Sequence, residues 1–312
     1  MRGTCILKSF IVLLALLLAG LHAARGDEML RLHQVDGHVY AVVGPLGNRT
    51  PENLGNNSTS GFVVTDEGVV LIDPGGSYRG AEAIAALIKQ VTDKPVRIVI
   101  NSGGQDHRWL GNGYFKERGA RIIASEAAVA DQRKRLRDQL FLLDNLVGEK
   151  GMAGTQAVYA DETFAEHTRF ELGGITFEIR LAGPAHTPGD SLVWLPGEGI
   201  VFAGDLVFVE RLLGVLEHSS SRGWIAAFDA MAALEPRVVI PGHGPATDLA
   251  QAGRDTRDYL VFLRQAVGAF MEAGGGIADI GQLDQSTFAN LAGYELLKGR
   301  NAQQVFQEME WE

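Results

Sequence analysis

The chain contains one cysteine among its 312 residues, and this residue, Cys5, lies close to the N-terminus. Basic residues precede an apolar run at 10–21, and small residues follow it as far as Gly26, which is the pattern of a signal peptide over 1–26. An uncleaved anchor is the alternative. After cleavage no cysteine would remain, which excludes disulfides and thiolate ligands, so any metal ion must be held by nitrogen and oxygen atoms. We expect a secreted or periplasmic protein.

Positive charge is also scarce, because 28 Lys and Arg residues face 38 Asp and Glu residues and give a net charge of −10. The basic run Arg133–Arg137 falls in a helical pattern among acidic residues, so a solvated helix face is the simpler interpretation. This balance argues against nucleic acid as the main partner. Beyond the leader, no apolar run is long enough to span a membrane. A small-molecule substrate is the partner we expect, and the sequence leaves the oligomeric state open.

Short β patterns alternate with amphipathic helical patterns along the rest of the chain, which indicates an α/β fold. The expected strands and hairpins cover 33–43, 61–73, 96–100, 120–124, 168–181, 191–203 and 237–240. The expected helices cover 81–91, 125–147, 223–234 and 249–271, with Ser125 as a candidate cap and short helices after 276. With 46% hydrophobic and 21% charged residues, the composition is that of an ordinary globular protein.

Metal-capable side chains follow four of the expected strands, each in a loop marked by glycine or proline. They are Asp106, His107, His186, Asp205 and His243. In layered α/β sheets such loops gather along one edge, where ligands bind. Two carboxylates and three imidazoles would suit zinc, or else iron or manganese. For the Asp106–His107 pair the simpler alternative is a helix cap followed by a surface residue. Structural roles are expected for four other histidines: His33, His38, His167 and His218.

Five segments carry a resemblance to a known family: GFVVTDEGVVLIDPGG at 61–76, VINSGGQDHRWLGN at 99–112, AHTPGDS around His186, FAGDLVF around Asp205 and IPGHG around His243. Over Val39–Asp248 the chain resembles the metallo-β-lactamase superfamily, and within it the SoxH-like exported zinc hydrolases. The resemblance implies a four-layer αββα sandwich with a metal site at one edge between the sheets. It places this domain at 27–250 and a helical C-terminal extension, packed on the domain, at 251–312.

The chain departs from the family motif His-x-His-x-Asp-His, whose six positions are read here as 102–107. The first two histidines are replaced by Ser102 and Gly104, so the resemblance implies that His186 alone remains from the first zinc site. The second site is complete in this reading. Its ligands are Asp106, His107, Asp205 and His243. We therefore expect one Zn²⁺ per chain.

The expected function is an exported, metal-dependent hydrolase in which zinc activates water against a small ester, amide, lactam or thioester. Asp106 or Asp205 would orient the water or accept its proton, and His186 would act as an acid–base group or bind an oxyanion. The expected substrate contacts are Ser102, Gln105 and Arg211. The alternative is a catalytically impaired zinc-binding accessory protein with no hydrolytic turnover, and oxidation of a persulfide by iron is a weaker third possibility.

Overall fold

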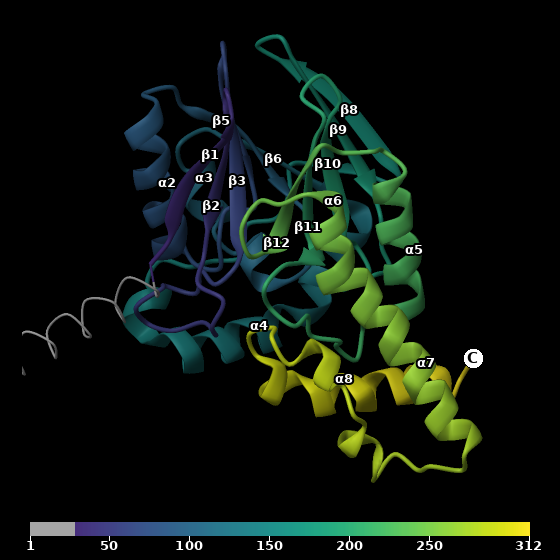
Figure 1. The fold of residues 1–312 in the computed structure, drawn as a ribbon. Coiled ribbons are helices and arrows are strands. Elements are labelled where there is room, and N and C mark those ends of the chain that lie inside the picture. Colours follow the sequence, from purple (N-terminus) through teal and green to yellow (C-terminus); the bar gives the residue numbers. More distant parts are fainter. Residues whose placement is uncertain (1–28) are drawn as a thin grey trace, which may run out of the picture.

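The computed structural model describes residues 29–312, so the signal peptide expected over 1–26 lies outside the described residues. Two β-sheets face each other in the centre, and helices cover their outer faces (Figure 1). This arrangement is the four-layer αββα sandwich that the sequence predicts. Within residues 29–312, no helix combines the length and apolar character that a membrane span requires.

The first sheet has seven strands in sequence order. They are β1 (Arg31–Asp36), β2 (Val39–Val43), β3 (Thr59–Thr65), β4 (Gly68–Ile72), β5 (Val96–Asn101), β6 (Arg121–Ser125) and β7 (Glu162–Phe164). Strands β1 to β4 run antiparallel to their neighbours, whereas β4 to β7 are parallel. The single strand expected at 33–43 is wrong: the chain turns at Gly37, whose φ of 34° is left-handed, and forms two strands.

The second sheet has five strands in the order β12-β11-β10-β9-β8. They are β8 (His167–Leu172), β9 (Ile175–Leu181), β10 (Ser191–Leu195), β11 (Ile200–Phe208) and β12 (Val238–His243). Strands β4, β10 and β11 are buried at every position, which explains why their sequences are apolar runs rather than alternating patterns.

Helices of very different length surround the sheets. They are α2 (Tyr78–Val91), α3 (Asn112–Lys116), α4 (Glu126–Met152), α5 (Ser221–Ala232), α6 (Leu249–Ala252), α7 (Asp258–Glu272) and α8 (Tyr294–Met309), with short turns η1 (Asp106–Arg108), η2 (Gly253–Arg257), η3 (Ile280–Gln282) and η4 (Ser286–Phe288). Ser125 caps α4 as expected, because its side chain accepts a hydrogen bond from the Ala128 N–H. The expectation of only short helices near the C-terminus is wrong, since α8 has 16 residues. Together α5, α7 and α8 pack with β11 in one apolar cluster.

An irregularity in β11 sets the direction of the Asp205 side chain. The strand expected to end at Ala203 continues to Phe208, so Asp205 lies inside β11 rather than just after it. The register between β11 and β12 shifts on both sides of Gly204. Gly204 has a φ of 54°, and a Cβ there would lie 2.4 Å from Oγ of Ser102, so only glycine fits. Such bulges redirect side chains, and this one turns Asp205 toward the end of β12.

Candidate metal centre

Three buried side chains from separate elements form a compact group, hereafter the metal cluster: His107, Asp205 and His243. His107 comes from η1, just after β5, whereas Asp205 lies in the bulged part of β11 and His243 ends β12. Their potential ligand atoms all lie within 4.8 Å of one another. Nε2 of His107 is 3.1 Å from Oδ2 of Asp205, and Nε2 of His243 is 3.4 Å from Oδ1.

The protonation state of His243 shows that the cluster suits a cation. Its Nδ1 is 2.9 Å from the carbonyl oxygen of Asn57, which can only accept, so Nδ1 carries the hydrogen. Burial lowers the pKa of His243 well below its usual value and keeps the ring neutral. Nε2 therefore points a lone pair at the carboxylate of Asp205. Two facing acceptors repel each other unless a cation lies between them, and this set of two imidazoles and one carboxylate fits zinc.

Asp106, which the sequence predicts to be a fourth ligand, lies on the far side of the His107 ring. Its Oδ1 accepts hydrogen bonds from Arg49 at 2.5 Å and from the His107 backbone N–H at 2.7 Å, and it is 3.0 Å from Nδ1 of His107. Burial alone would raise the pKa of Asp106, but Arg49 and His107 lower it below its usual value. In this structure Asp106 therefore orients His107, and its role as a ligand stays a prediction.

Arg108 is a site residue that the sequence analysis missed. Its side chain is fully buried, and its Nε and Nη2 donate to both carboxylate oxygens of Asp205, at 3.0 and 2.5 Å. It also donates to Asp73 Oδ2 at 2.9 Å and to the carbonyl oxygens of Thr59 and Gly242. Although burial would raise the pKa of Asp205, Arg108 and the histidines lower it well below the usual value. The one available signal was an arginine next to the Asp-His pair, directly before the apolar residues Trp109 and Leu110.

Carboxylates and guanidinium groups are paired around the metal cluster. The buried carboxylates are Asp73, Asp106 and Asp205, and the guanidinium groups that pair with them are Arg49 and Arg108. Because each carboxylate oxygen accepts more than one partner, Asp205 can bind Arg108 and still offer a lone pair to a cation.

Ser102 and Gly104, which stand where the sequence analysis expects the first-site histidines, make contacts of another kind. Ser102 donates from its N–H and its Oγ to Asp73, at 2.8 and 2.7 Å, and holds that residue in a left-handed conformation with a φ of 62°. A Cβ at Gly104 would lie 2.0 Å from Oδ2 of Asp131. Asp131 pairs with Arg135, which also donates to Oε1 of Gln105 at 2.9 Å. Residues 102–105 with Asp131 and Arg135 are hereafter the filled half.

His186, the expected remnant of the first site, lies against the rings of Phe208 and Trp224, with centroids 5.8 and 5.1 Å away. Burial lowers its pKa to about 3, so it is neutral near pH 7. Among residues 29–312, nothing hydrogen-bonds to its buried Nδ1. His218, which the sequence analysis assigned a structural role, resembles it: burial lowers its pKa to about 4, and both ring nitrogens are buried without a partner in the described chain.

A cavity of about 610 Å³ opens onto the metal cluster and has walls of two kinds. Its polar lining includes Asn48, Arg49, Asn57, Gln105, His107, His186, Arg211, His243 and Arg300. Its apolar lining includes Leu46, Leu142, Leu146, Phe208, Leu216, Leu296 and Leu297. Of the expected substrate contacts, Gln105 and Arg211 line this cavity, whereas Ser102 is not among the described residues that do so. Burial lowers the pKa of Arg211 to about 10, which leaves it charged near pH 7.

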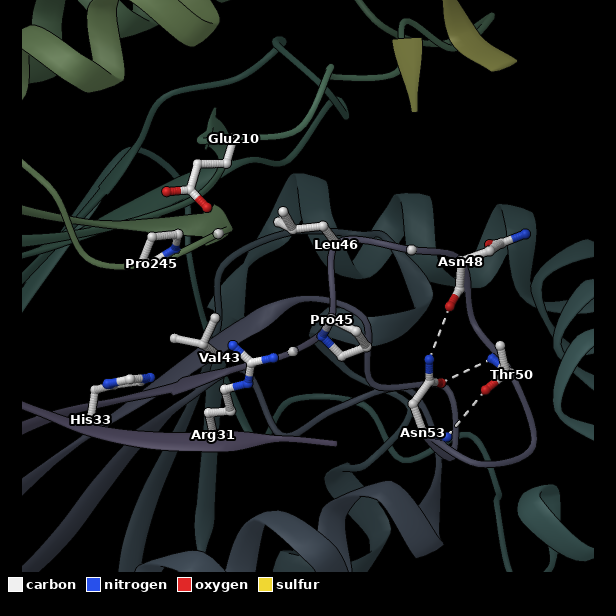
Figure 2. Close-up of a pocket in the computed structure, with 13 residues that line it drawn as sticks. Arg31, His33, Val43, Pro45, Leu46, Asn48, Thr50, Asn53, Glu210 and Pro245 are labelled. Atoms are coloured by element: carbon white, nitrogen blue, oxygen red, sulfur yellow. Dashed lines mark hydrogen bonds between the residues drawn. The ribbon is translucent and has the colours of Figure 1, made fainter. Parts of the chain in front are cut away.

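The loop around 46–50 separates this cavity from a second one of about 610 Å³, shown in Figure 2. Asn53 fixes the loop, because its side chain donates to the carbonyl of Asn48 at 2.9 Å and accepts from the N–H of Thr50 at 2.9 Å. The second cavity is bordered by Arg31 and His33 of β1 and by Glu210. None of the three residues of the metal cluster is among the described residues that line it, so it is distinct from the metal cluster.

Comparison with known proteins agrees with this architecture. The linear primary-alkylsulfatase of a Pseudomonas species is 20% identical over 258 residues, covering 68% of this chain and 47% of its own length. A solved metallo-beta-lactamase from Pontibacter korlensis has 24% identity and a TM-score of 0.58, over 74% of this chain and 99% of its own. The stereoselective inverting sec-alkylsulfatase from Pseudomonas sp. has 19% identity and a TM-score of 0.67, over 89% of this chain and 50% of its own. This chain thus spans about half of either alkylsulfatase.

The metallo-beta-lactamase superfamily model matches residues 54–243, which contain all of the metal cluster. The match runs from the loop before β3 to the last residue of β12. Both the sandwich and the grouping of donors at its edge agree with that match. The chain belongs to the metallo-beta-lactamase superfamily, a family of metal-dependent hydrolases.

Proposed function

We propose that the protein is a hydrolase that uses one zinc ion held by His107, Asp205 and His243. The observation that carries this proposal is the lone pair of His243 Nε2, which faces the Asp205 carboxylate at 3.4 Å in a buried site. Zinc held there would lower the pKa of a bound water toward roughly 7 and polarise the bond under attack. The open cavity beside the cluster gives a substrate access to it.

The surrounding residues have distinct roles in this mechanism. Asp106 and Arg49 position His107, because Oδ1 of Asp106 lies 3.0 Å and Nη2 of Arg49 lies 2.7 Å from its Nδ1, while its Nε2 faces Asp205. Arg108 positions Asp205 through both of its carboxylate oxygens. His186 is neutral and reaches the cavity, so it can exchange a hydrogen bond with a substrate oxygen.

The substrate in this proposal is a small ester that carries an anionic group. Arg49 and Arg211 line the cavity close to the cluster, and a guanidinium group binds sulfate, phosphate or carboxylate with two parallel hydrogen bonds. The related alkylsulfatase is named for an ester of this kind. Amides, lactams and thioesters with an anionic group fit the same arrangement.

We also infer that the family motif aligns one residue later than the sequence alone suggested. The last two positions of the motif are consecutive ligands, and the consecutive side chains that contact Asp205 here are His107 and Arg108. On this alignment Gly103 and Gln105 replace the first two histidines, His107 replaces the aspartate and Arg108 replaces the last histidine. Either alignment removes both first-site histidines, so the proposal of a single metal ion does not depend on the choice.

A second candidate function is a zinc-binding accessory protein without turnover. It is favoured by the bidentate pairing of Arg108 with Asp205, which already compensates that carboxylate, and by the Asp131–Arg135 pair beside Gly104. Export to the periplasm or the medium and membership of the SoxH-like branch remain proposals, which rest on the pattern at 1–26 and on the motifs.

The experiment that separates the candidates measures metal content and hydrolysis on the same purified protein. We expect about one zinc per chain and turnover of at least one substrate class in a panel of sulfate, phosphate and carboxylate esters, thioesters and β-lactams. His243→Ala should lose both. His167→Ala is the matched control, because His167 is an exposed histidine on β8. Full zinc occupancy without turnover on any substrate would favour the accessory protein, and two zinc ions per chain would refute the single site.

A further inference from the structure

Two helices that are distant in the sequence, α4 and α8, contribute apolar side chains to one wall of the cavity. They are Leu142 and Leu146 from α4, and Leu296 and Leu297 from α8. Figure 1 shows both helices at the same end of the molecule, below the two sheets. Leu142 is 44% exposed and Leu296 is 73% exposed, which is unusual for two large apolar residues that line the same cavity.

Positive charge is concentrated toward the metal cluster in the same cavity. Arg49 reaches Asp106 beside His107, and Arg211 donates to the carbonyl of Gly47 at 2.8 Å, so both lie near the inner end. Arg300 lies on α8, one turn beyond Leu296 and Leu297. The cavity therefore combines a cationic inner region with an apolar wall that continues to the exposed leucines.

One chemical class complements both regions, namely a single alkyl chain that carries an anionic group at one end. The volume of about 610 Å³ is that of a small-molecule site, whereas a partner helix would need an open groove. A neutral apolar ligand would leave Arg211 with no anionic partner and only the carbonyl of Gly47 as an acceptor. A small anion without a chain would leave the leucines in contact with water.

We propose that α4 and α8 form a binding site for the alkyl chain of an amphiphilic anionic substrate, whose head group lies at Arg49 and Arg211. The assignment rests on the proposed function, because hydrolysis at the metal cluster requires the head group to lie there. Leu142 and Leu296 contact the distal part of the chain, and Leu146 and Leu297 contact the part nearer the head group.

The test is a titration of the metal-loaded protein with n-alkanesulfonates of increasing chain length, kept below the concentration at which they aggregate. These probes carry the anionic head group and the chain, but they contain no ester bond, so binding is measured without turnover. Each added methylene group should tighten binding about fourfold, which corresponds to about 0.8 kcal/mol for a buried methylene. The gain should stop once the chain extends past Leu142 and Leu296.

A pair of variants separates this site from general adsorption. Leu142→Asn combined with Leu296→Asn should reduce the gain to less than about twofold per methylene, because both residues then present a polar surface to the chain. Phe141→Asn is the matched control, since Phe141 is 72% exposed on the same helix but is not among the described residues that line the cavity. Both variants change exposed residues, and equal melting temperatures would confirm that they fold.

Equal chain-length dependence in the wild type and the double variant would overturn the proposal, as would an equal loss in Phe141→Asn. The proposed hydrolysis fails separately. Tight sulfonate binding that depends on chain length, without turnover of any ester, would support the alkyl-chain site and refute the proposed hydrolase activity. Turnover of short esters, with sulfonate binding that does not depend on chain length, would support the hydrolase activity and refute the alkyl-chain site.

Discussion

The metal cluster and the filled half lie next to each other at the same edge of the sandwich, yet they are completed in different ways. In the metal cluster, an acceptor nitrogen of His243 faces an acceptor oxygen of Asp205, and a cation between them would offset their repulsion. In the filled half, the Asp131–Arg135 pair from α4 occupies the space beside Gly104 and satisfies its own charges. Packing therefore closes one half of this edge, whereas the other half keeps a group of side chains that could hold a metal ion.

The largest effect that would test this comparison is expected from Arg108→Met. The change leaves the buried carboxylates of Asp73 and Asp205 without their shared partner, and breaking such a pair costs about 3–5 kcal/mol. Urea unfolding would measure the loss. Arg79→Met is the control, because Arg79 forms an exposed pair with Glu82 and should change stability by less than about 0.5 kcal/mol. A similar result for both variants would show that Arg108 does not hold the cluster together.

Removal of metal should come next in size. A chelator should lower the melting temperature of the wild type, because a ligand present at about 1,000 times its Kd stabilises the folded state by about 4 kcal/mol. In Asp205→Asn the chelator should change the melting temperature little, since the variant has lost the central carboxylate of the cluster. Equal shifts in the two proteins would place the metal elsewhere.

Addition of one carbon atom to the filled half should have a smaller effect. In Gly104→Ala the new Cβ would lie 2.0 Å from Oδ2 of Asp131, so we expect a loss of about 1–3 kcal/mol from overpacking. Gly197→Ala is the control, because none of the described chain lies within 4 Å of a Cβ there. If Asp131→Ala relieves the loss in a double variant, α4 fills the half-site; a purely additive result would contradict that account.

The smallest effect is a pH dependence from His218. Its folded pKa of about 4 lies below the usual value of 6.5, so the unfolded state binds the proton more readily. The stability associated with neutral His218 is thus present above about pH 6.5 and is lost as the pH falls through 4. We expect His218→Asn to remove about 1–2 kcal/mol of that dependence, less than the shift alone implies because the ring is partly solvated. An unchanged pH profile in the variant would contradict the assignment.

Much of this structure could be predicted from the sequence, and the exceptions share a physical cause. The sandwich and the grouping of His107, Asp205 and His243 follow from apolar strands that end in glycine- and proline-marked loops. The backbone conformation of the one-turn helix η1 determines which of its three side chains face Asp205, and the residue types alone do not predict those directions. For this reason Asp106 was expected at the cluster, whereas Arg108 was missed.

Long-range packing explains the other exceptions. Asp131 lies 27 residues after Gly104, and only the tertiary arrangement of α4 shows that its carboxylate occupies the space beside that glycine. The exposure of Leu296 on α8 next to Leu142 on α4 also depends on contacts between distant segments. The sequence indicated a helical C-terminal segment packed on the domain without indicating that it lines a cavity.

The most direct test of the central claim is a zinc-loaded crystal structure with anomalous data collected at the zinc edge. We predict one peak per chain, coordinated by Nε2 of His107, Nε2 of His243 and the carboxylate of Asp205, with Nδ1 of His107 in contact with Asp106 and Arg49. A peak beside Asp131 and His186, or none within coordination distance of His243, would contradict the account.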